Sequence, residues 1–399
     1  MQTLFLFVVP ALLAAPLFAD EPEPAARALK EVPADGASHL VACKGATYWI
    51  ALPPGHDPKS PTRVLVWLHG SNMNGKAYVE SLKSLEFGKD EILVGVNGNG
   101  KIKDWVYNFD YDPKPVLKTL EDMESRMKLG PVYVGGHSQG AYFTMLLLTK
   151  FPERFAGGCA FAGGLLKGCD PKAAANRKGR PGPAFALIHG EADPVVDVEL
   201  SDFAFQIFLD AEWPRLRYYH PKELNHMFLL GPVKDAIEWM FATTSEDPAL
   251  LLAAAERFLG EGRGSDALYC VEAARDRKAD RAATDALRDR ILAAGGEQAT
   301  PWAELLGGKR EPSPGWPAEL YDFVERWALV PSAQPALRAL EIRRKREVSE
   351  ASKLSRNAWA AVRKNEVDKA RGLFRELALD CPTAFEYARA AERWLARNP

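Results

Sequence analysis

Short apolar runs alternate with amphipathic stretches between residues 47 and 243. This alternation is typical of a mostly parallel sheet with helices on both faces, so we predict an α/β fold. Ligands of such sheets bind at the carboxyl ends of the strands. The predicted strands are Tyr48–Leu52, Arg63–Leu68, Glu91–Val96, Val132–Gly135, Gly157–Phe161, Ala184–Ile188 and Arg215–Tyr219, and the predicted helices are 75–85, 115–128, 139–150, 195–209 and 232–241.

Beyond Ser245 the chain becomes rich in Ala and Arg and has almost no strand-like runs. We therefore predict an α/β domain at residues 45–244 and an all-α domain at residues 245–399. Two windows of the second domain fit the tetratricopeptide helix-pair pattern, although generic amphipathic helices would produce many of the same matches. The matching positions are Leu251, Ala255, Phe258, Ala267, Val271 and Ala274 in the first window, and Leu354, Ala358, Ala361, Ala370, Phe374, Leu377 and Pro382 in the second.

The N-terminus is an apolar run of signal-peptide length, from Leu4 to Phe18, followed by Ala19 and an acidic, Pro-rich stretch. This pattern predicts a signal peptide at residues 1–19, a linker at residues 20–44, and export to the periplasm or the extracellular space. The run lacks a preceding Lys or Arg, and an uncleaved anchor is the alternative, although the run is short for a bilayer.

Composition narrows the function classes. The chain has 399 residues, a formal net charge of -2, 26% charged and 47% hydrophobic residues, as in ordinary globular proteins of two or three domains. It shows no basic patch that would predict a nucleic-acid partner. Of its five cysteines, Cys159 and Cys169 could bridge or remain thiols. No Cys-x-x-Cys or His-x-x-x-His spacing predicts a metal site, and we expect no cofactor.

The segment 131–140, Pro-Val-Tyr-Val-Gly-Gly-His-Ser-Gln-Gly, reads as a buried strand that runs into a G-x-S-x-G turn. In this turn a serine sits on a strained strand-to-helix corner, so the positions two before and two after it must be nearly free of side chain. Gly136 and Gly140 meet that requirement, and Ser138 is the candidate nucleophile. The alternative is a Gly-rich turn of another doubly wound protein.

A serine nucleophile needs a base that is oriented by a carboxylate. The turn after the strand Ala184–Ile188 contains Asp193, which we predict as the acid. Glu191 and Asp197 are the alternatives, and Asp193 could instead cap the following helix.

The histidine should follow the next strand, and His226 is the predicted base, with His220 as its rival. The resulting chain order of Ser138, Asp193 and His226 is the order found in α/β-hydrolases.

The tetrahedral intermediate of acyl transfer also needs N–H donors for its oxyanion. Gln139, directly after the nucleophile, offers one backbone N–H. The second donor is predicted at Ser71, in the loop after the strand Arg63–Leu68, where Gly70 permits close approach. We expect His69 to brace this loop through its ring nitrogens, and His137 to be structural.

On these motifs, residues 45 to 243 resemble the secreted esterase group of α/β-hydrolases that includes polyhydroxyalkanoate depolymerases and feruloyl esterases. The resemblance implies transfer of an acyl group from an ester to water, with Ser138 as nucleophile, Asp193 orienting the base and His226 as general acid and base. Depolymerase-like members commonly carry Cys after the His-Gly pair, whereas this chain has Ser71. The matching parts are Leu68-His69-Gly70, residues 136–140, His189-Gly190 with Asp193, and Asn225-His226.

Aromatic residues alternate after Val96, beginning with Trp105 and Tyr107. They could form a substrate-binding wall for an apolar acyl group, or belong to a hairpin whose alternate residues pack on the core. The stretch between Phe161 and Pro183 is too short for a large helical lid. An open site for small-molecule or polymeric esters follows.

The predicted function is a serine hydrolase that cleaves carboxylic esters through an acyl-enzyme intermediate. A peptidase related to the prolyl oligopeptidases would share the fold and the residue order. A third hypothesis is an inactive hydrolase-fold scaffold whose helical tail binds a protein partner.

Overall fold

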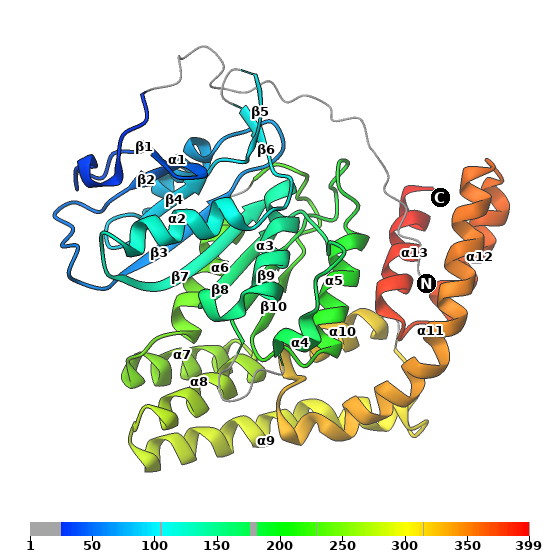
Figure 1. Cartoon of the computed structure of the whole chain (residues 1–399). Coiled ribbons are helices and arrows are strands. Elements are labelled where there is room, and N and C mark those ends of the chain that lie inside the picture. The colour runs from blue at the N-terminus through cyan, green and yellow to red at the C-terminus, as the bar shows by residue number, and fades with distance from the viewer. Residues whose placement is uncertain (1–24, 104–105, 176–181, 229, 314, 399) are drawn as a thin grey trace. The chain divides into compact units, whose positions relative to one another are not determined.

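The computed structural model describes residues 25–398 except 104–105, 176–181, 229 and 314. The chain divides into two compact units, Met1–Thr244 and Ser245–Pro399, and each unit is described by itself (Figure 1). The predicted signal peptide lies outside the described residues. Among the described residues, no helix combines the length and the apolar character that a membrane crossing requires.

Unit 1 is built on an eight-stranded sheet with the order β1-β2-β4-β3-β7-β8-β9-β10. All neighbouring pairs from β4 to β10 are parallel, and the β1–β2 and β2–β4 pairs are antiparallel. The prediction of a mostly parallel sheet is therefore confirmed. Its strands are β1 (His39–Cys43), β2 (Ala46–Ala51), β3 (Thr62–Leu68), β4 (Ile92–Val96), β7 (Leu129–His137), β8 (Gly157–Phe161), β9 (Ala184–Ile188) and β10 (Leu216–Tyr219).

Strand β1 lies inside the predicted linker, so the stretch assigned to the linker is in part a strand of the sheet. It forms a hairpin with β2 in which Cys43 pairs with Ala46. The two-residue connection ends on Gly45, whose φ of 93° is a conformation that glycine adopts without strain. Strand β1 is only five residues long. It forms because this turn reverses the chain and pairs β1 with β2.

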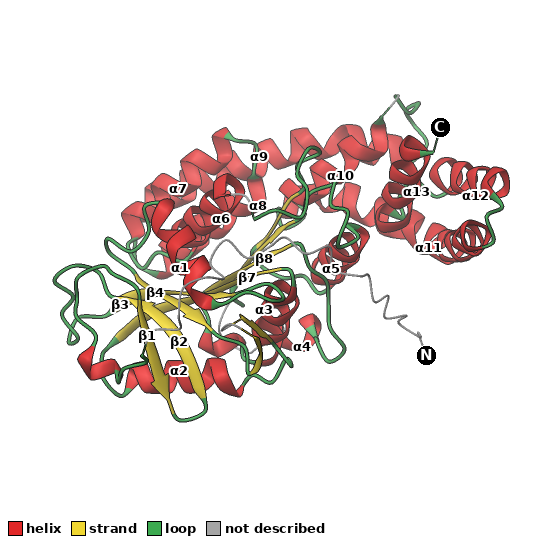
Figure 2. Cartoon of the chain, turned by 90° about the horizontal axis from the view of Figure 1, so that it is seen from above, coloured by secondary structure: helices red, strands yellow, loops and turns green. Residues whose placement is uncertain are grey.

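Helices cover both faces of the sheet, as predicted. Figure 2 shows α1 (Gly75–Ser84) and α6 (Leu230–Thr243) on one side of the sheet, and α2 (Lys114–Glu124) and α3 (Gln139–Lys150) on the other. Every residue of β4, β8 and β9 is buried, as expected for strands covered on both faces. The remaining elements of unit 1 are η1 (Leu29–Glu31), η2 (Pro152–Arg154), α4 (Pro171–Ala175), α5 (Glu199–Asp210) and a separate hairpin of β5 (Gly100–Lys103) with β6 (Val106–Asn108).

Unit 2 is all helical in its described residues. Both tetratricopeptide-like windows form helix pairs, α7 with α8 and α11 with α12, and every position that matched the pattern is buried. Burial of these positions in packed helix pairs is thus observed, with Pro382 in the turn after α12, whereas membership in the repeat family stays a prediction. The helices are α7 (Pro248–Gly260), α8 (Gly264–Asp276), α9 (Arg281–Leu306), α10 (Trp316–Trp327), α11 (Gln334–Arg363), α12 (Val367–Asp380) and α13 (Phe385–Arg397), with the short turn η3 (Pro331–Ala333).

Candidate active site

Ser138 stands at the corner between β7 and α3. Its φ of 53° lies in the left-handed region, which is strained for a residue with a side chain. The corner holds because the glycines beside it leave room: a Cβ on Gly140 would lie 2.1 Å from the carbonyl oxygen of Leu68. A Cβ on Gly136 would lie 2.3 Å from the carbonyl oxygen of Gly140. The strained strand-to-helix turn that the G-x-S-x-G pattern requires is therefore present.

The structure brings the three candidate triad residues together from three different strand ends. The Nε2 atom of His226 lies 3.1 Å from Oγ of Ser138, and its Nδ1 atom lies 2.7 Å from Oδ2 of Asp193. Asp193 accepts only, so Nδ1 carries the hydrogen and Nε2 is left as the acceptor for the serine hydroxyl. This is the arrangement in which a histidine can take the proton of a serine.

Asp193 is held in place by more than the base. Its Oδ1 atom accepts hydrogen bonds from the backbone N–H groups of Val195 and Val196, at 2.8 and 3.0 Å. Burial alone would raise the pKa of Asp193, but hydrogen bonds from His189, His226 and the Val196 N–H hold it well below its ordinary value. Asp193 is therefore a carboxylate at any pH near neutral.

The rival acid and base contact each other. Glu191 Oε1 lies 3.2 Å from Nδ1 of His220, whereas the hydroxyl of Ser138 has His226 as its partner. Asp197, the third candidate acid, is exposed. The geometry thus selects Asp193 and His226 from the candidates that the sequence left open.

One candidate oxyanion donor directly follows the serine in the chain, and the other belongs to the loop after β3. Gln139 is the first residue of α3, and its side chain is engaged with the backbone of Phe109 through two hydrogen bonds of 2.9 and 3.0 Å. The loop after β3 lies against the serine, because a Cβ on Gly70 would be 3.5 Å from Cβ of Ser138. The N–H of Gly70 donates to the hydroxyl of Tyr78 at 3.2 Å, which leaves Ser71 as the next backbone donor in this loop.

His69 braces the loop after β3 that contains Ser71, called here the oxyanion loop. Its Nδ1 atom donates to the carbonyl of Gly70 at 2.7 Å, and Nε2 accepts from the N–H of Gly98 at 2.9 Å. The ring also stacks on Phe109, with the centroids 4.4 Å apart. Burial lowers the pKa of His69 to about 4, so the ring is neutral and its two nitrogens have the opposite roles that these partners need.

His137 links the loop of the base to the oxyanion loop. Its Nε2 atom donates to the carbonyl of His226 at 2.8 Å, and Nδ1 accepts from the hydroxyl of Tyr78 at 2.8 Å. Tyr78 in turn accepts from the N–H of Gly70. Burial, followed by the neighbouring His226, lowers the pKa of His137 to about 3. The sequence pointed to His137 but not to Tyr78, a buried residue of α1 with no motif around it.

These two neutral histidines predict a loss of stability in acid. The pKa values of His69 and His137 in the folded state, about 4 and about 3, lie below the ordinary value of 6.5. The unfolded chain therefore binds the extra protons, so their contribution is fully present above about pH 6.5 and falls as the pH decreases. At pH 5, each of the two histidines should lower the free energy of unfolding by about 2 kcal/mol relative to its contribution at high pH. Urea unfolding at pH 7 and 5 checks this, and a His69→Gln variant should show the smaller pH dependence.

The predicted aromatic wall takes a different form in the structure. Trp105 lies outside the described residues. Tyr107 and Phe109 are only 6% and 5% exposed, and the backbone N–H of Tyr107 donates to the carbonyl of Met73 at 2.8 Å. The prediction that Tyr107 lines an open wall is therefore wrong. Tyr107 instead fits the alternative hypothesis, in which alternate residues of a hairpin pack on the core. Its ring lies near that of His69.

Three further side chains near the elements of the site, Tyr142, Leu200 and Met227, were not indicated by the sequence pattern. Tyr142 follows Ser138 by one turn of α3, and a Cβ on Gly164 would lie 3.3 Å from its ring and 2.9 Å from Leu200. Among the described residues the Tyr142 hydroxyl has no hydrogen-bond partner, and burial raises the pKa of this phenol. Leu200 is 41% exposed and Met227, next to the base, is 68% exposed. Leu200 and Met227 form what we call the apolar rim, and Tyr142 adds one hydroxyl without a partner among the described residues.

The cysteines take no part in this site. Cys159 and Cys169 are free thiols, so the possible bridge between them is not formed. Burial raises the pKa of both, which keeps them protonated and unreactive.

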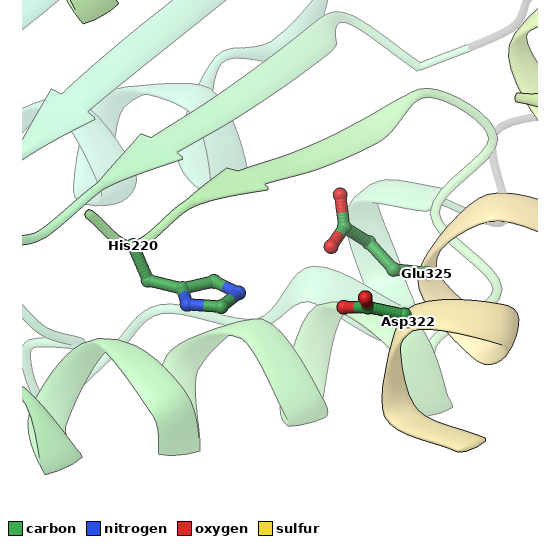
Figure 3. A group of neighbouring side chains, drawn as sticks. All are labelled: His220, Asp322 and Glu325. Atoms are coloured by element: carbon green, nitrogen blue, oxygen red, sulfur yellow. The ribbon is translucent and has the colours of Figure 1, made fainter. Parts of the chain in front are cut away.

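A further group of potential ligands involves residues of both units. Figure 3 shows Asp322 and Glu325, one turn apart on α10 of unit 2, together with His220 of unit 1. The positions of the units relative to one another are not determined, so these side chains do not define a site.

Comparisons with known proteins place the site in a family context. Residues 118–238 match the Phospholipase/Carboxylesterase family, and this segment contains Ser138, Asp193 and His226. Feruloyl esterase C of Emericella nidulans is 25% identical over 162 residues, which are 39% of this chain and 57% of that protein. The chain thus spans little more than half of the length of this relative.

Solved structures with similar folds cover about half of the chain. Acetyl xylan esterase from Aspergillus awamori has a TM-score of 0.42 and 15% identity, over 51% of this chain and 99% of that one. Esterase PE8 has a TM-score of 0.39 and 22% identity, over 48% and 97%. By its strand order and its covering helices, unit 1 has the α/β-hydrolase fold. The sequence matches relate it to esterases of the carboxylesterase type.

Proposed function

We propose that this protein is a serine hydrolase that cleaves carboxylic esters through an acyl-enzyme intermediate. The observation that carries the proposal is the hydrogen-bonded series from Ser138 Oγ through the ring of His226 to Asp193, set at a strained strand-to-helix corner. Each of the three groups has the hydrogen-bonding role that nucleophilic catalysis by serine requires.

In the proposed reaction, Nε2 of His226 takes the hydroxyl proton of Ser138 while Oγ attacks the ester carbonyl. The carbonyl oxygen becomes an oxyanion, for which the N–H groups of Gln139 and Ser71 are the proposed donors. His226 then gives its proton to the departing alcohol, and the acyl group stays on Oγ. Water, deprotonated by the same Nε2 atom, attacks the acyl-enzyme and releases the acid.

Ester substrates are favoured over peptides by the family match and by the feruloyl esterase relative. The apolar rim of Leu200 and Met227 suits an acyl or alcohol group with apolar surface, and the hydroxyl of Tyr142 is available to a polar substituent. We propose an esterase of the feruloyl-esterase-like or depolymerase-like kind. Turnover of p-nitrophenyl esters against aminoacyl anilides separates this proposal from a prolyl-oligopeptidase-like activity.

Covalent labelling tests the proposed nucleophile. A fluorophosphonate probe should label the wild-type chain once, and peptide mass spectrometry should locate the adduct on Ser138. The Ser138→Ala variant should not react, whereas a variant of the exposed Ser84 should react as the wild type does. An adduct on another residue, or a Ser138→Ala variant that is still labelled, would contradict the proposal.

Unit 1 alone should be catalytically sufficient. All residues of the proposed site precede Ser245, where the second unit begins. A fragment of residues 25–244 should therefore hydrolyse p-nitrophenyl acetate with a kcat/KM within about threefold of that of the full chain. A threefold change in rate corresponds to a change in activation free energy of less than about 1.4 kcal/mol, the amount that gives a tenfold change. A well-folded fragment without turnover would instead indicate that unit 2 contributes to the site.

A further inference from the structure

His189 is a fully buried histidine that follows β9, and the proposed triad does not include it. Its Nε2 atom lies 3.2 Å from Oδ2 of Asp193, the same oxygen that His226 contacts. Nε2 also lies 3.0 Å from the carbonyl oxygen of Val196. On the other side of the ring, Nδ1 lies 2.7 Å from Oγ of Ser201. Both ring nitrogens therefore have close polar partners.

The hydrogens available to these contacts can be counted. The carbonyl of Gly163 only accepts, so its 2.6 Å contact with Oγ of Ser201 uses the single hydroxyl hydrogen of that serine. The contact between Ser201 and Nδ1 of His189 then requires a hydrogen on Nδ1.

The other ring nitrogen faces only acceptors. Asp193 is a carboxylate and Val196 offers a carbonyl, so neither supplies a hydrogen to Nε2 of His189. A neutral imidazole carries one hydrogen, and this position requires two. Only the doubly protonated ring satisfies every contact, and a buried polar atom without a partner is costly.

We propose that His189 is held as an imidazolium cation against Asp193, and that it is a positioning residue through which one carboxylate serves two histidines. The proposal rests on the proposed function, because its consequence is expressed in the base. Both contacts end on the same oxygen, so the nitrogens of His189 and His226 are roughly 6 Å apart at most. A like charge within this range disfavours a second protonated ring. The positive charge of His189 thus favours the neutral form of the proposed base, which is the form that can take the proton of Ser138.

Charged groups on the surrounding elements are consistent with this assignment. On α5, the buried Asp202 follows Ser201 and accepts from the hydroxyl of Tyr218 on β10 at 3.1 Å. His137 on β7 is neutral because of its lowered pKa. On the turn that carries Asp193, Glu191 pairs with His220 and Asp197 is exposed.

Nuclear magnetic resonance of the full chain tests the protonation directly. The chain has seven histidines, so ¹⁵N-histidine labelling gives a spectrum in which each ring can be assigned by substitution. One ring should carry hydrogen on both nitrogens at about pH 7.5, and the His189→Gln variant should lack it. A His189 ring with a single hydrogen at about pH 7.5 would overturn the proposal. This readout does not depend on ester turnover, so it stands apart from the proposed function.

The pH dependence of catalysis tests the consequence. In His189→Gln the acidic midpoint of kcat/KM for p-nitrophenyl acetate should move up by about one pH unit, because the nearby positive charge is gone. The matched control is His220→Gln, which removes a histidine that also pairs with a carboxylate of this turn and should leave the midpoint in place. A lower rate with an unchanged midpoint would show a merely structural role and overturn the proposal.

A second variant keeps the test valid where His189→Gln does not fold. Ser201→Ala removes the acceptor of the Nδ1 hydrogen, so the singly protonated ring with hydrogen on Nε2 becomes acceptable. The midpoint should move up in this variant too, and the ring that carries two hydrogens in the wild type should carry only one at about pH 7.5. A Ser201→Ala chain with neither change would count against the assignment.

Discussion

Replacing Ser138 with alanine should lower kcat for p-nitrophenyl acetate by about 10⁴- to 10⁶-fold, with little change in KM. The hydroxyl is the atom that forms the acyl-enzyme, and its contact with Nε2 of His226 at 3.1 Å is the first step of the proposed proton transfer. The proposed oxyanion donors and the apolar rim stay in place, so the variant should still hydrolyse the ester somewhat faster than the uncatalysed reaction in water. Initial rates with purified protein, together with a fluorophosphonate titration of active sites, measure the effect.

Two controls accompany this variant. Ser84→Ala, on the exposed face of α1, should retain full activity. His226→Gln should cost about as much as Ser138→Ala, and the double variant should cost no more than either single variant, because the two groups act as one unit. A Ser138→Ala enzyme that keeps more than about a hundredth of the wild-type rate would show that another residue is the nucleophile.

Local sequence signals predicted several of the elements that build the site. The predicted bounds of β8, β9 and helix α3 coincide with those in the structure, because each is an apolar run with glycine or proline at or near an end. The G-x-S-x-G pattern located the corner for the same reason: the backbone there tolerates only glycine at two positions. The chain order of the remaining triad candidates narrowed the choice to a few side chains.

Residues that act through tertiary contact were beyond such signals. Tyr78 is a buried residue of α1 like any other until the fold sets its hydroxyl between His137 and Gly70. His189 was part of a motif, but its hydrogen count depends on Ser201 of α5, twelve residues later. The prediction for Tyr107 failed because alternation of apolar residues shows only that one face of a strand is buried. It does not show whether that face contacts a substrate or the core.

Replacing Asp193 with asparagine should lower kcat by about 10⁴-fold and also destabilise the fold. An asparagine amide that faces Nδ1 of His226 would favour the tautomer with hydrogen on Nε2, which cannot accept the proton of Ser138. The same change removes the anion beside His189, and breaking a buried ion pair by removing one partner costs about 3–5 kcal/mol. Rates at about pH 8 and urea unfolding at pH 7 measure the two effects separately.

Asp197→Asn is the matched control, since it changes an exposed carboxylate of the same turn and should leave both the rate and the stability within error. The two effects of Asp193→Asn distinguish the roles of the carboxylate. A large loss of kcat with unchanged stability would indicate that Asp193 orients His226 but does not pair with a cation at His189. A loss of stability with a normal kcat would instead remove Asp193 from the proposed triad and leave it as the partner of His189 alone.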